Sequence, residues 1–150
     1  MEQRDGLITR SLSWVKGERA PVVPVVPLRG VIGQAGAFRR GLSVDTVGPL
    51  LSRAFRVKRA EAVAIIINSP GGSPVQSSLI AARIRQLSDE NELPVLAFCE
   101  DVAASGGYWL AAAADEIFVD RSSIVGSIGV ISSGFGFTEA IKKLGIQRRM

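Results

Sequence analysis

The sequence predicts an α/β domain built from βαβ units around a parallel sheet. Two continuous apolar runs, AVAIIIN (62–68) and PVLAFC (94–99), are typical of strands that are buried on both faces. Segments with apolar residues at helical spacing lie between and after these runs, and glycine or proline turns separate them. This alternation over 150 residues is that of a single domain large enough to bury a core.

The first strand and the first helix follow from prolines and from helical spacing. In PVVPVVPLRGVIG (21–33), the prolines exclude a helix and a central strand position early on. Valine and isoleucine then favour a strand from about Val25 to Ile32. Residues 43–57 have apolar side chains at helical spacing, with Ser43 as the cap. Gly48-Pro49 is expected to weaken or kink the first turns of this helix.

The strand at 62–68 leads through a glycine turn into a second helix. We expect this helix to run from Pro74 to about Ser88. Ser73 is its expected N-cap, and Gln76 is expected to complete a capping box. The side chains expected on its apolar face are Val75, Leu79, Ala82 and Leu87.

The rest of the chain repeats the alternation of strands and helices. We expect a strand at 94–99, a helix at 105–114, a strand at 116–120, a glycine-punctuated strand region at 123–133 and a helix at 136–145 that Gly145 ends. The sequence holds no internal repeat or linker. The domain is therefore expected to extend over 22–150, after a loosely ordered lead-in at 1–21.

Composition excludes several classes of site. The net charge is +4, but only 6% of the residues are aromatic and the basic pairs flank expected helix ends, so no nucleic-acid partner is expected. The chain has no histidine and one cysteine, Cys99, which lies in an apolar run and is expected to be a small buried hydrophobe. We therefore expect neither a metal site nor a cofactor.

The sequence also bears on localisation. No secretory signal and no apolar run of membrane-spanning length are visible in these residues. The expectation is a cytoplasmic chain without a transmembrane segment, associated with a membrane only through partners.

Two glycine turns carry the candidate chemistry. NSPGG (68–72) follows a buried strand and precedes a capped helix, so backbone N–H groups there suit an oxyanion or a phosphate, or the segment is simply a turn. AASGG (103–107) places Ser105 after another strand and resembles a nucleophile elbow, although a helix-capping role for Ser105 is the alternative. Adjacent parallel strands would bring the two turns together, where ligands bind in α/β sheets.

These motifs resemble those of a known family. IINSPGGSPVQSS (66–78) and VAASGGYWLAAAADEIFVDRSSIVGSIGV (102–130) are similar to the serine peptidases of the signal peptide peptidase A (protease IV, S49) family. The resemblance runs from about Val25 to Met150. It implies a fold related to caseinolytic protease (ClpP) and crotonase, a homo-oligomer, peptide substrates and a Ser-Lys dyad. It also implies that Ser105 is the nucleophile and that Gly72 and Gly106 form the oxyanion hole.

A Ser-Lys dyad accounts for the missing histidine, because a desolvated lysine can accept a hydroxyl proton near neutral pH. By the resemblance, this lysine lies past Met150. Lys142 and Lys143 are the candidates within the chain, although a solvated helix face is the simpler interpretation of both.

The leading hypothesis is therefore a serine endopeptidase that cleaves unstructured, apolar-rich peptides. One alternative is a crotonase-like acyl-CoA enzyme, which would use the same two N–H groups and take acid–base chemistry from Glu100, Asp101 or Glu139. The other is a non-catalytic or truncated subunit of a peptidase assembly. A Ser-His-Asp peptidase is excluded within this chain, because it has no histidine.

Overall fold

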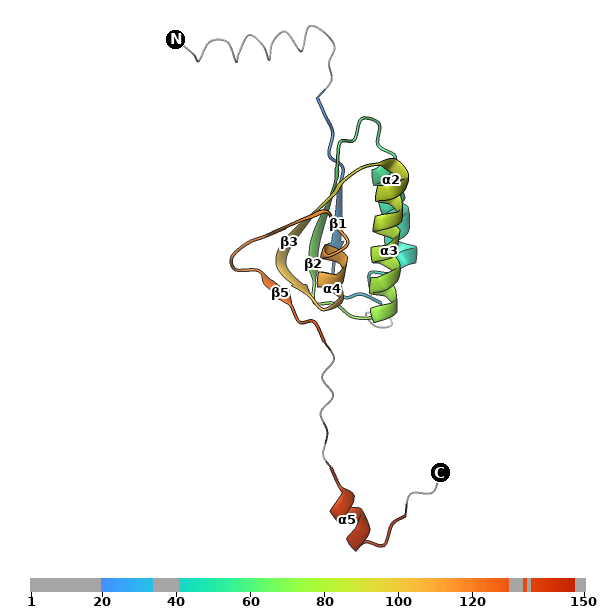
Figure 1. The fold of residues 1–150 in the computed structure, drawn as a ribbon, viewed down its shortest axis with the longest axis vertical. Coiled ribbons are helices and arrows are strands. Elements are labelled where there is room, and N and C mark those ends of the chain that lie inside the picture. Colours follow the sequence, from blue (N-terminus) through green and yellow to red (C-terminus); the bar gives the residue numbers. More distant parts are fainter. Residues whose placement is uncertain (1–19, 34–40, 130–133, 135, 148–150) are drawn as a thin grey trace.

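The computed structural model describes residues 20–33, 41–129, 134 and 136–147, and its core is a sheet with helices on one side (Figure 1). The elements are β1 (Val25–Arg29), α2 (Val44–Phe55), β2 (Val63–Ser69), α3 (Pro74–Asn91), β3 (Val95–Ala104), α4 (Gly106–Ala111), β4 (Glu116–Val119), β5 (Ile124–Gly126) and α5 (Thr138–Lys143). The α/β class predicted from the sequence is confirmed.

The sheet is parallel throughout its described strands. Its order is β1-β2-β3-β4, and β5 pairs with the far end of β3. The register shifts between Ile67 and Ser69, so that Ser69 lies opposite Ala103. The carboxyl ends of β2 and β3 therefore run side by side, and each leads directly into a glycine turn and a helix.

The hydrophobic core lies between the sheet and the helices. Side chains of β1 and β2, such as Leu28 and Ile65, are fully buried, as are Leu51 of α2 and Ile84 of α3. Ser43 caps α2 as predicted, in a capping box with Thr46.

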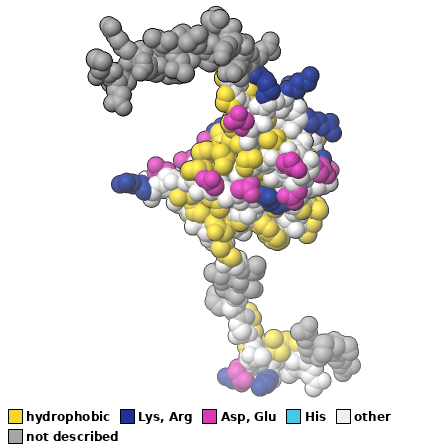
Figure 2. Space-filling model, turned by 45° about the horizontal axis from the view of Figure 1, so that its top comes forward, with side chains coloured by type: hydrophobic (Ala, Val, Ile, Leu, Met, Phe, Trp, Pro, Cys, Tyr) yellow, Lys and Arg dark blue, Asp and Glu magenta, His cyan; other side chains and the backbone are white. Residues whose placement is uncertain are grey.

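The run at 62–68 is buried or intermediate along its whole length, whereas the run at 94–99, also predicted to be buried on two faces, is covered mainly on one. In β3 burial alternates along the strand, and Phe98 stacks on Phe118 of β4 at 4.9 Å between ring centroids although both are partly exposed. Figure 2 shows hydrophobic side chains gathered over the left and middle of the body, which is the sheet side of Figure 1. The described helices α2, α3 and α4 cover only the other face.

The predicted apolar face of α3 is wrong except for Leu87. Val75, Leu79 and Ala82 are exposed. The buried side chains are Ser77, Ile80, Ala81, Ile84, Leu87 and Ser88. Two of these buried residues are serines, so the buried face of α3 does not stand out as apolar in the sequence. Both serines can be buried because their hydroxyls donate to backbone carbonyls: Ser77 Oγ to Ser73 O and Ser88 Oγ to Leu93 O.

The predicted capping box of α3 is also wrong in its second half. Ser73 accepts from the Gln76 N–H as an N-cap should. The Gln76 side chain turns instead to α2, where its Oε1 accepts from the Val44 N–H at 2.9 Å. Gln76 thus satisfies an unpaired N–H at the start of a different helix.

Several boundaries differ from the predictions. The strand β3 runs on to Ala104, whereas α4 ends at Ala111. Gly145, with φ +67, follows the last helix as predicted. Cys99 is buried as predicted, and burial raises the pKa of its thiol. Residues 1–19 of the predicted lead-in and 130–133 of the last strand region lie outside the described residues.

Gly48 offers a test of the helix interior. It lies inside α2, where a Cβ would meet no atom within 4 Å outside the adjacent residues and the local helix backbone, and the backbone is not left-handed. Gly48→Ala is therefore expected to raise the free energy of unfolding by about 0.5–1 kcal/mol. Chemical denaturation measures this change, and a loss of stability would show that α2 does not continue through Gly48-Pro49.

Asp115 ties the start of β4 to β3 and α3. Its carboxylate accepts from the Val95 N–H at 2.7 Å and from Arg85 at 3.0 Å. These bonds, the Val95 N–H first, hold the pKa of Asp115 below its ordinary 3.8.

Because the folded-state pKa is lowered, this stabilisation is present at neutral pH and is lost as the pH falls through that pKa. Asp115→Asn should lower Tm at pH 7, with a difference that narrows below pH 3.8. Asp89→Asn, which removes only the exposed partner of Arg85, serves as the control and should change Tm little. A pH-independent Tm difference for Asp115→Asn would contradict the assignment.

Candidate functional site

The two glycine turns lie in contact, as the parallel topology predicts. A Cβ on Gly71 would stand 2.8 Å from both Ser105 Cβ and Gly106 N. Gly71 and Gly72 have positive φ angles of 93° and 146°, so the first turn depends on glycine. The structure thus brings together the predicted nucleophile and both predicted oxyanion donors.

The backbone of Ser105 bears on both interpretations of this residue, helix cap and nucleophile. Its φ of 52° and ψ of −117° lie outside the regions favoured by side-chain-bearing residues, at a cost of about 1–3 kcal/mol. Its side chain makes no capping hydrogen bond to α4, and the residue is exposed. A capping serine gains an N–H partner and needs no such strain, whereas a nucleophile elbow has this strain and exposure.

Small residues around Ser105 allow the sharp turn. A Cβ on Gly106 would fall on Ser77 Oγ in the first turn of α3, and one on Gly107 would lie 2.6 Å from Ser69 O at the end of β2. The start of α4 therefore sits directly on β2 and α3. On the other side, the Ser105 N–H donates to Gly126 O of β5 at 2.7 Å.

The N–H groups of Gly72 and Gly106 are available to a ligand. Gly106 is the first residue of α4, so its N–H has no acceptor within the helix. At the first turn, Ile32 forms a parallel β-bridge with Gly72: the Ile32 N–H donates to Gly71 O, and Ile32 O accepts from the Ser73 N–H. The Gly72 N–H takes no part in these two hydrogen bonds. Two free N–H donors suit an oxyanion hole, and the exposed Ser105 hydroxyl lies beside them.

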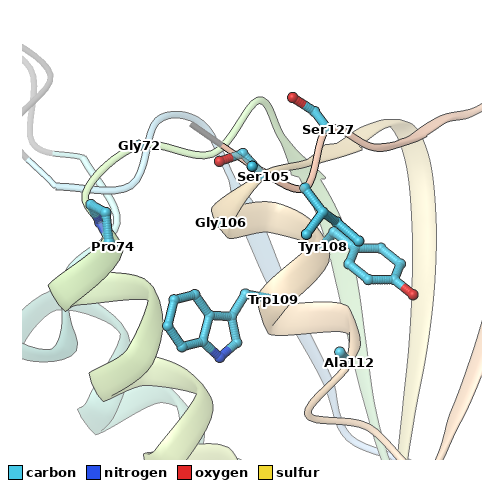
Figure 3. A pocket seen from close by; sticks show the side chains of 10 residues that line it. Gly72, Pro74, Ser105, Gly106, Tyr108, Trp109, Ala112 and Ser127 are labelled. Atoms are coloured by element: carbon cyan, nitrogen blue, oxygen red, sulfur yellow. The ribbon is translucent and has the colours of Figure 1, made fainter. Parts of the chain in front are cut away.

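Ser105 opens into a cavity of about 360 Å³. The cavity is lined by Gly72, Pro74, Ser105, Gly106, Tyr108, Trp109, Ala112, Ser127, Ile128 and Gly129. Figure 3 shows the Ser105 hydroxyl beside the turn at Gly72, with the Trp109 ring lower down toward α3 and the Ser127 hydroxyl above and to the right of Ser105. The lining is mostly apolar and carries no Lys, Arg, Asp or Glu side chain of the described residues.

Seven of the ten lining residues were not predicted as site residues, among them Trp109, Ser127 and Ile128. Trp109 lies one helical turn after Ser105, and its N–H donates to Ser105 O, so i+4 spacing from the serine was the available signal. Ser127 has a positive φ of 52° and directly follows Gly126, the acceptor for the Ser105 N–H. Only the pairing of β5 with β3 brings this segment to the cavity.

The candidate lysines within the chain do not lie at the cavity. Lys142 and Lys143 belong to α5, whose described side chains are exposed and which stands apart from the sheet in Figure 1. Lys142 pairs with Glu139 at 3.2 Å. The structure therefore does not bring either lysine to Ser105.

The acidic candidates for acyl-CoA chemistry are also absent from the cavity lining. Glu100 pairs with Arg29, whose hydrogen bond is the main cause of a lowered pKa for that carboxyl. Asp101 accepts from Asn68 at 2.8 Å. These carboxylates are partnered within the sheet, and Glu139 lies on α5.

Comparison with known proteins shows similarity to a family of peptidases. The model of peptidase family S49 matches residues 88–150. The chain is 34% identical over 124 residues to protease 4 of Haemophilus influenzae, covering 83% of this chain and 20% of that protein. A solved structure titled 1510-N membrane-bound stomatin-specific protease S97A mutant matches 84% of this chain and 60% of that chain at a TM-score of 0.57 and 19% identity, which supports the fold.

Another relative has a different name. The chain is 56% identical over 145 residues to a Na(+)/H(+) antiporter NhaA of Brucella melitensis, covering 96% of this chain but 19% of that protein. Among the described residues, no helix has both the length and the apolar character needed to cross a bilayer. The chain spans about a fifth of the length of these curated relatives.

Proposed function

The chain belongs to peptidase family S49, the signal peptide peptidase A and protease IV family, and from this membership we propose that it carries the nucleophile and oxyanion hole of a serine peptidase. Ser105 is the nucleophile, and the N–H groups of Gly72 and Gly106 are the oxyanion donors. The strained, exposed backbone of Ser105 beside the 71–72 turn is the observation that carries this proposal.

The proposed reaction is acyl transfer through Ser105. Its Oγ attacks the carbonyl carbon of the scissile peptide bond, and the resulting oxyanion accepts hydrogen bonds from the two glycine N–H groups. A general base takes the hydroxyl proton and returns it to the leaving amine. Water then hydrolyses the acyl-enzyme and frees Ser105.

We propose that the base is a lysine outside these 150 residues, as the family resemblance implies. The described part of the cavity supports this choice, because its lining is mostly apolar and contains no carboxylate. Such surroundings disfavour the ammonium form and lower the pKa of a lysine that enters them.

The geometry favours a peptidase over the crotonase-like alternative. An acyl-CoA enzyme would use the two N–H groups without a serine, and it would leave the cost of the Ser105 backbone unexplained. Its candidate acids are partnered away from the cavity. A non-catalytic subunit likewise has no use for a strained, exposed serine.

The cavity also supports the proposed preference for apolar, unstructured peptides. Trp109 is 48% exposed and lies beside Ser105, where it can pack against an apolar side chain next to the scissile bond. Trp109→Ala is expected to lower kcat/KM about tenfold for a substrate with leucine there, and less for one with alanine.

Leu50→Ala is the control for this prediction. It removes an apolar side chain of α2 of similar exposure, 50%, that does not line the cavity. An equal loss for the leucine and alanine substrates would mean that Trp109 does not form the apolar pocket.

We further propose that the protein acts in the cytoplasm as a homo-oligomer. The partly exposed apolar face of the sheet, which includes Phe98 and Phe118, is surface that such an assembly can bury. Size-exclusion chromatography with light scattering of the natural protein measures its subunit number, and a monomer at micromolar concentration would contradict the assembly.

The test of the proposed function is cleavage of unstructured apolar peptides by the natural full-length protein. Ser105→Ala should remove the activity, with the circular dichroism spectrum unchanged. Ser78→Ala, which changes an exposed serine of α3, should leave the activity intact. Cleavage that persists in Ser105→Ala would overturn the proposal.

A further inference from the structure

Ile32 lies against both glycine turns of the candidate site. It follows β1 and is 40 positions from Gly72 in the sequence, yet it forms a parallel bridge to that residue. Its side chain is 2% exposed. An isoleucine side chain has no group that could take part in peptide hydrolysis, so any role of Ile32 must come from its contacts with the two turns.

The backbone of Ile32 fixes the first oxyanion donor. Its N–H donates to Gly71 O at 2.8 Å, and its carbonyl accepts from the Ser73 N–H at 2.8 Å. In a planar trans peptide, the carbonyl and the following N–H point in opposite directions. Because Gly71 O points at Ile32, the Gly72 N–H must point away from Ile32.

The second donor obeys the same rule. Ser105 O accepts from the Trp109 N–H at 3.1 Å and so points down α4. The Gly106 N–H of the same peptide unit therefore points out of the start of the helix. Each donor is thus aimed by the hydrogen bond of the carbonyl that shares its peptide unit.

The side chain of Ile32 connects the two turns. Its Cδ1 lies 3.1 Å from the position that a Cβ on Gly106 would take. The same residue therefore holds the Gly71–Gly72 peptide with its backbone and contacts the Gly106 turn with its side chain. Ile32 is therefore the spacer that separates the Gly72 N–H from the Gly106 N–H.

We propose that Ile32 is a positioning residue that sets the direction and spacing of the Gly72 and Gly106 N–H groups. It does not contact the reacting atoms, and it acts through the two turns. This inference rests on the proposed peptidase function. It predicts that a smaller side chain at position 32 weakens oxyanion binding without weakening the binding of substrate.

The experiment compares Ile32→Ala with Ile84→Ala in the natural full-length protein. Both residues are buried isoleucines, but Ile84 lies on the core face of α3, 12 residues after Gly72 and 22 before Gly106 in the sequence. It is not among the nearest neighbours of a Cβ at Gly71, Gly72 or Gly106. Ile32→Ala should lower kcat at least about tenfold with KM changed less than about twofold. It should also weaken inhibition by a peptide aldehyde, whose hemiacetal oxygen occupies the oxyanion position, by the same factor.

The control variant, Ile84→Ala, should have a lower Tm than the wild type but the same kcat and the same affinity for the peptide aldehyde. Ile32→Val, which loses only Cδ1, should fall between wild type and Ile32→Ala in kcat. Equal losses of kcat in Ile32→Ala and Ile84→Ala, or an unchanged aldehyde affinity in Ile32→Ala, would overturn the inference.

A second measurement separates this inference from the peptidase proposal. Hydrogen–deuterium exchange of the peptides that contain Gly72 and Gly106 needs no catalytic activity. Exchange should speed up in both peptides in Ile32→Ala and in neither in Ile84→Ala. If the wild type proves inactive, the peptidase proposal fails, and unchanged exchange in Ile32→Ala would overturn the positioning role by itself.

Discussion

Ser105→Gly is expected to abolish peptide cleavage and, at the same time, to raise the free energy of unfolding by about 1 kcal/mol. The activity is lost with the Oγ nucleophile. Stability rises because glycine adopts φ 52° and ψ −117° without the steric strain that serine has there. This relief of strain is larger than the extra chain entropy that glycine loses on folding. Chemical denaturation and a peptide-cleavage assay on the same preparations measure the two effects.

Two controls separate strain from chemistry in this prediction. Ser105→Ala removes the hydroxyl but keeps a Cβ, so it should be inactive without a gain in stability. Ser78→Gly, in the exposed interior of α3, should keep the activity and lose stability. A Ser105→Gly variant that is less stable than the wild type would show that the backbone of Ser105 is not strained in the folded protein.

Gly106→Ala is expected to lower kcat by about 100-fold or more, the scale seen when one oxyanion donor is lost. The added Cβ would fall on Ser77 Oγ and lie 3.1 Å from Ile32 Cδ1. Both neighbours are buried, so α4 must move and carry the Gly106 N–H away from its position. Single-turnover cleavage measures the loss, and thermal denaturation measures the accompanying fall in Tm.

A second substitution tests the cause. Ser77→Gly removes the side chain that the new methyl group meets, so the double variant Gly106→Ala, Ser77→Gly should recover part of the lost kcat relative to Gly106→Ala. Gly48→Ala serves as the control for a glycine-to-alanine change with open space around it, and it should keep full activity. Full activity in Gly106→Ala would remove Gly106 from the oxyanion hole.

The strands and the meeting of the two turns were predictable because they depend on local patterns and one topological rule. The β-branched run at 62–68 and the apolar run at 94–99 identify neighbouring parallel strands, and the chain leaves both at the same edge of the sheet. The caps at Ser43 and Ser73 were predictable for the same reason, since capping needs only nearby residues.

Most of the errors arise where a distant partner decides the environment. The burial of Ser77 has a local cause instead: its hydroxyl donates to Ser73 O four residues earlier, so Ser77 can face the core while the apolar Leu79 is exposed. Gln76 bonds to Val44 of another helix rather than to its own N-cap. Phe98 is partly exposed because the described helices cover only one face of the sheet. Single-sequence spacing carries none of this information.

The contribution of Ile32 was not predictable from the sequence at all. It acts through backbone groups that every residue except proline possesses, and through a contact with a glycine far along the chain. Trp109 was within reach, because it lies one helical turn after the serine singled out by the elbow motif. Sequence patterns therefore identified the proposed nucleophile, but not the residues that we propose orient the N–H donors around it.

The role of Ser105 as the nucleophile is tested by the site of labelling with a serine-directed phosphonate. The natural full-length protein is treated with the reagent, digested and mapped by mass spectrometry, with Ser105→Ala as the matched sample. We expect one stoichiometric adduct on the peptide that contains Ser105, and none in Ser105→Ala. Labelling at another serine, or equal labelling of both proteins, would contradict the assignment of Ser105 as the nucleophile.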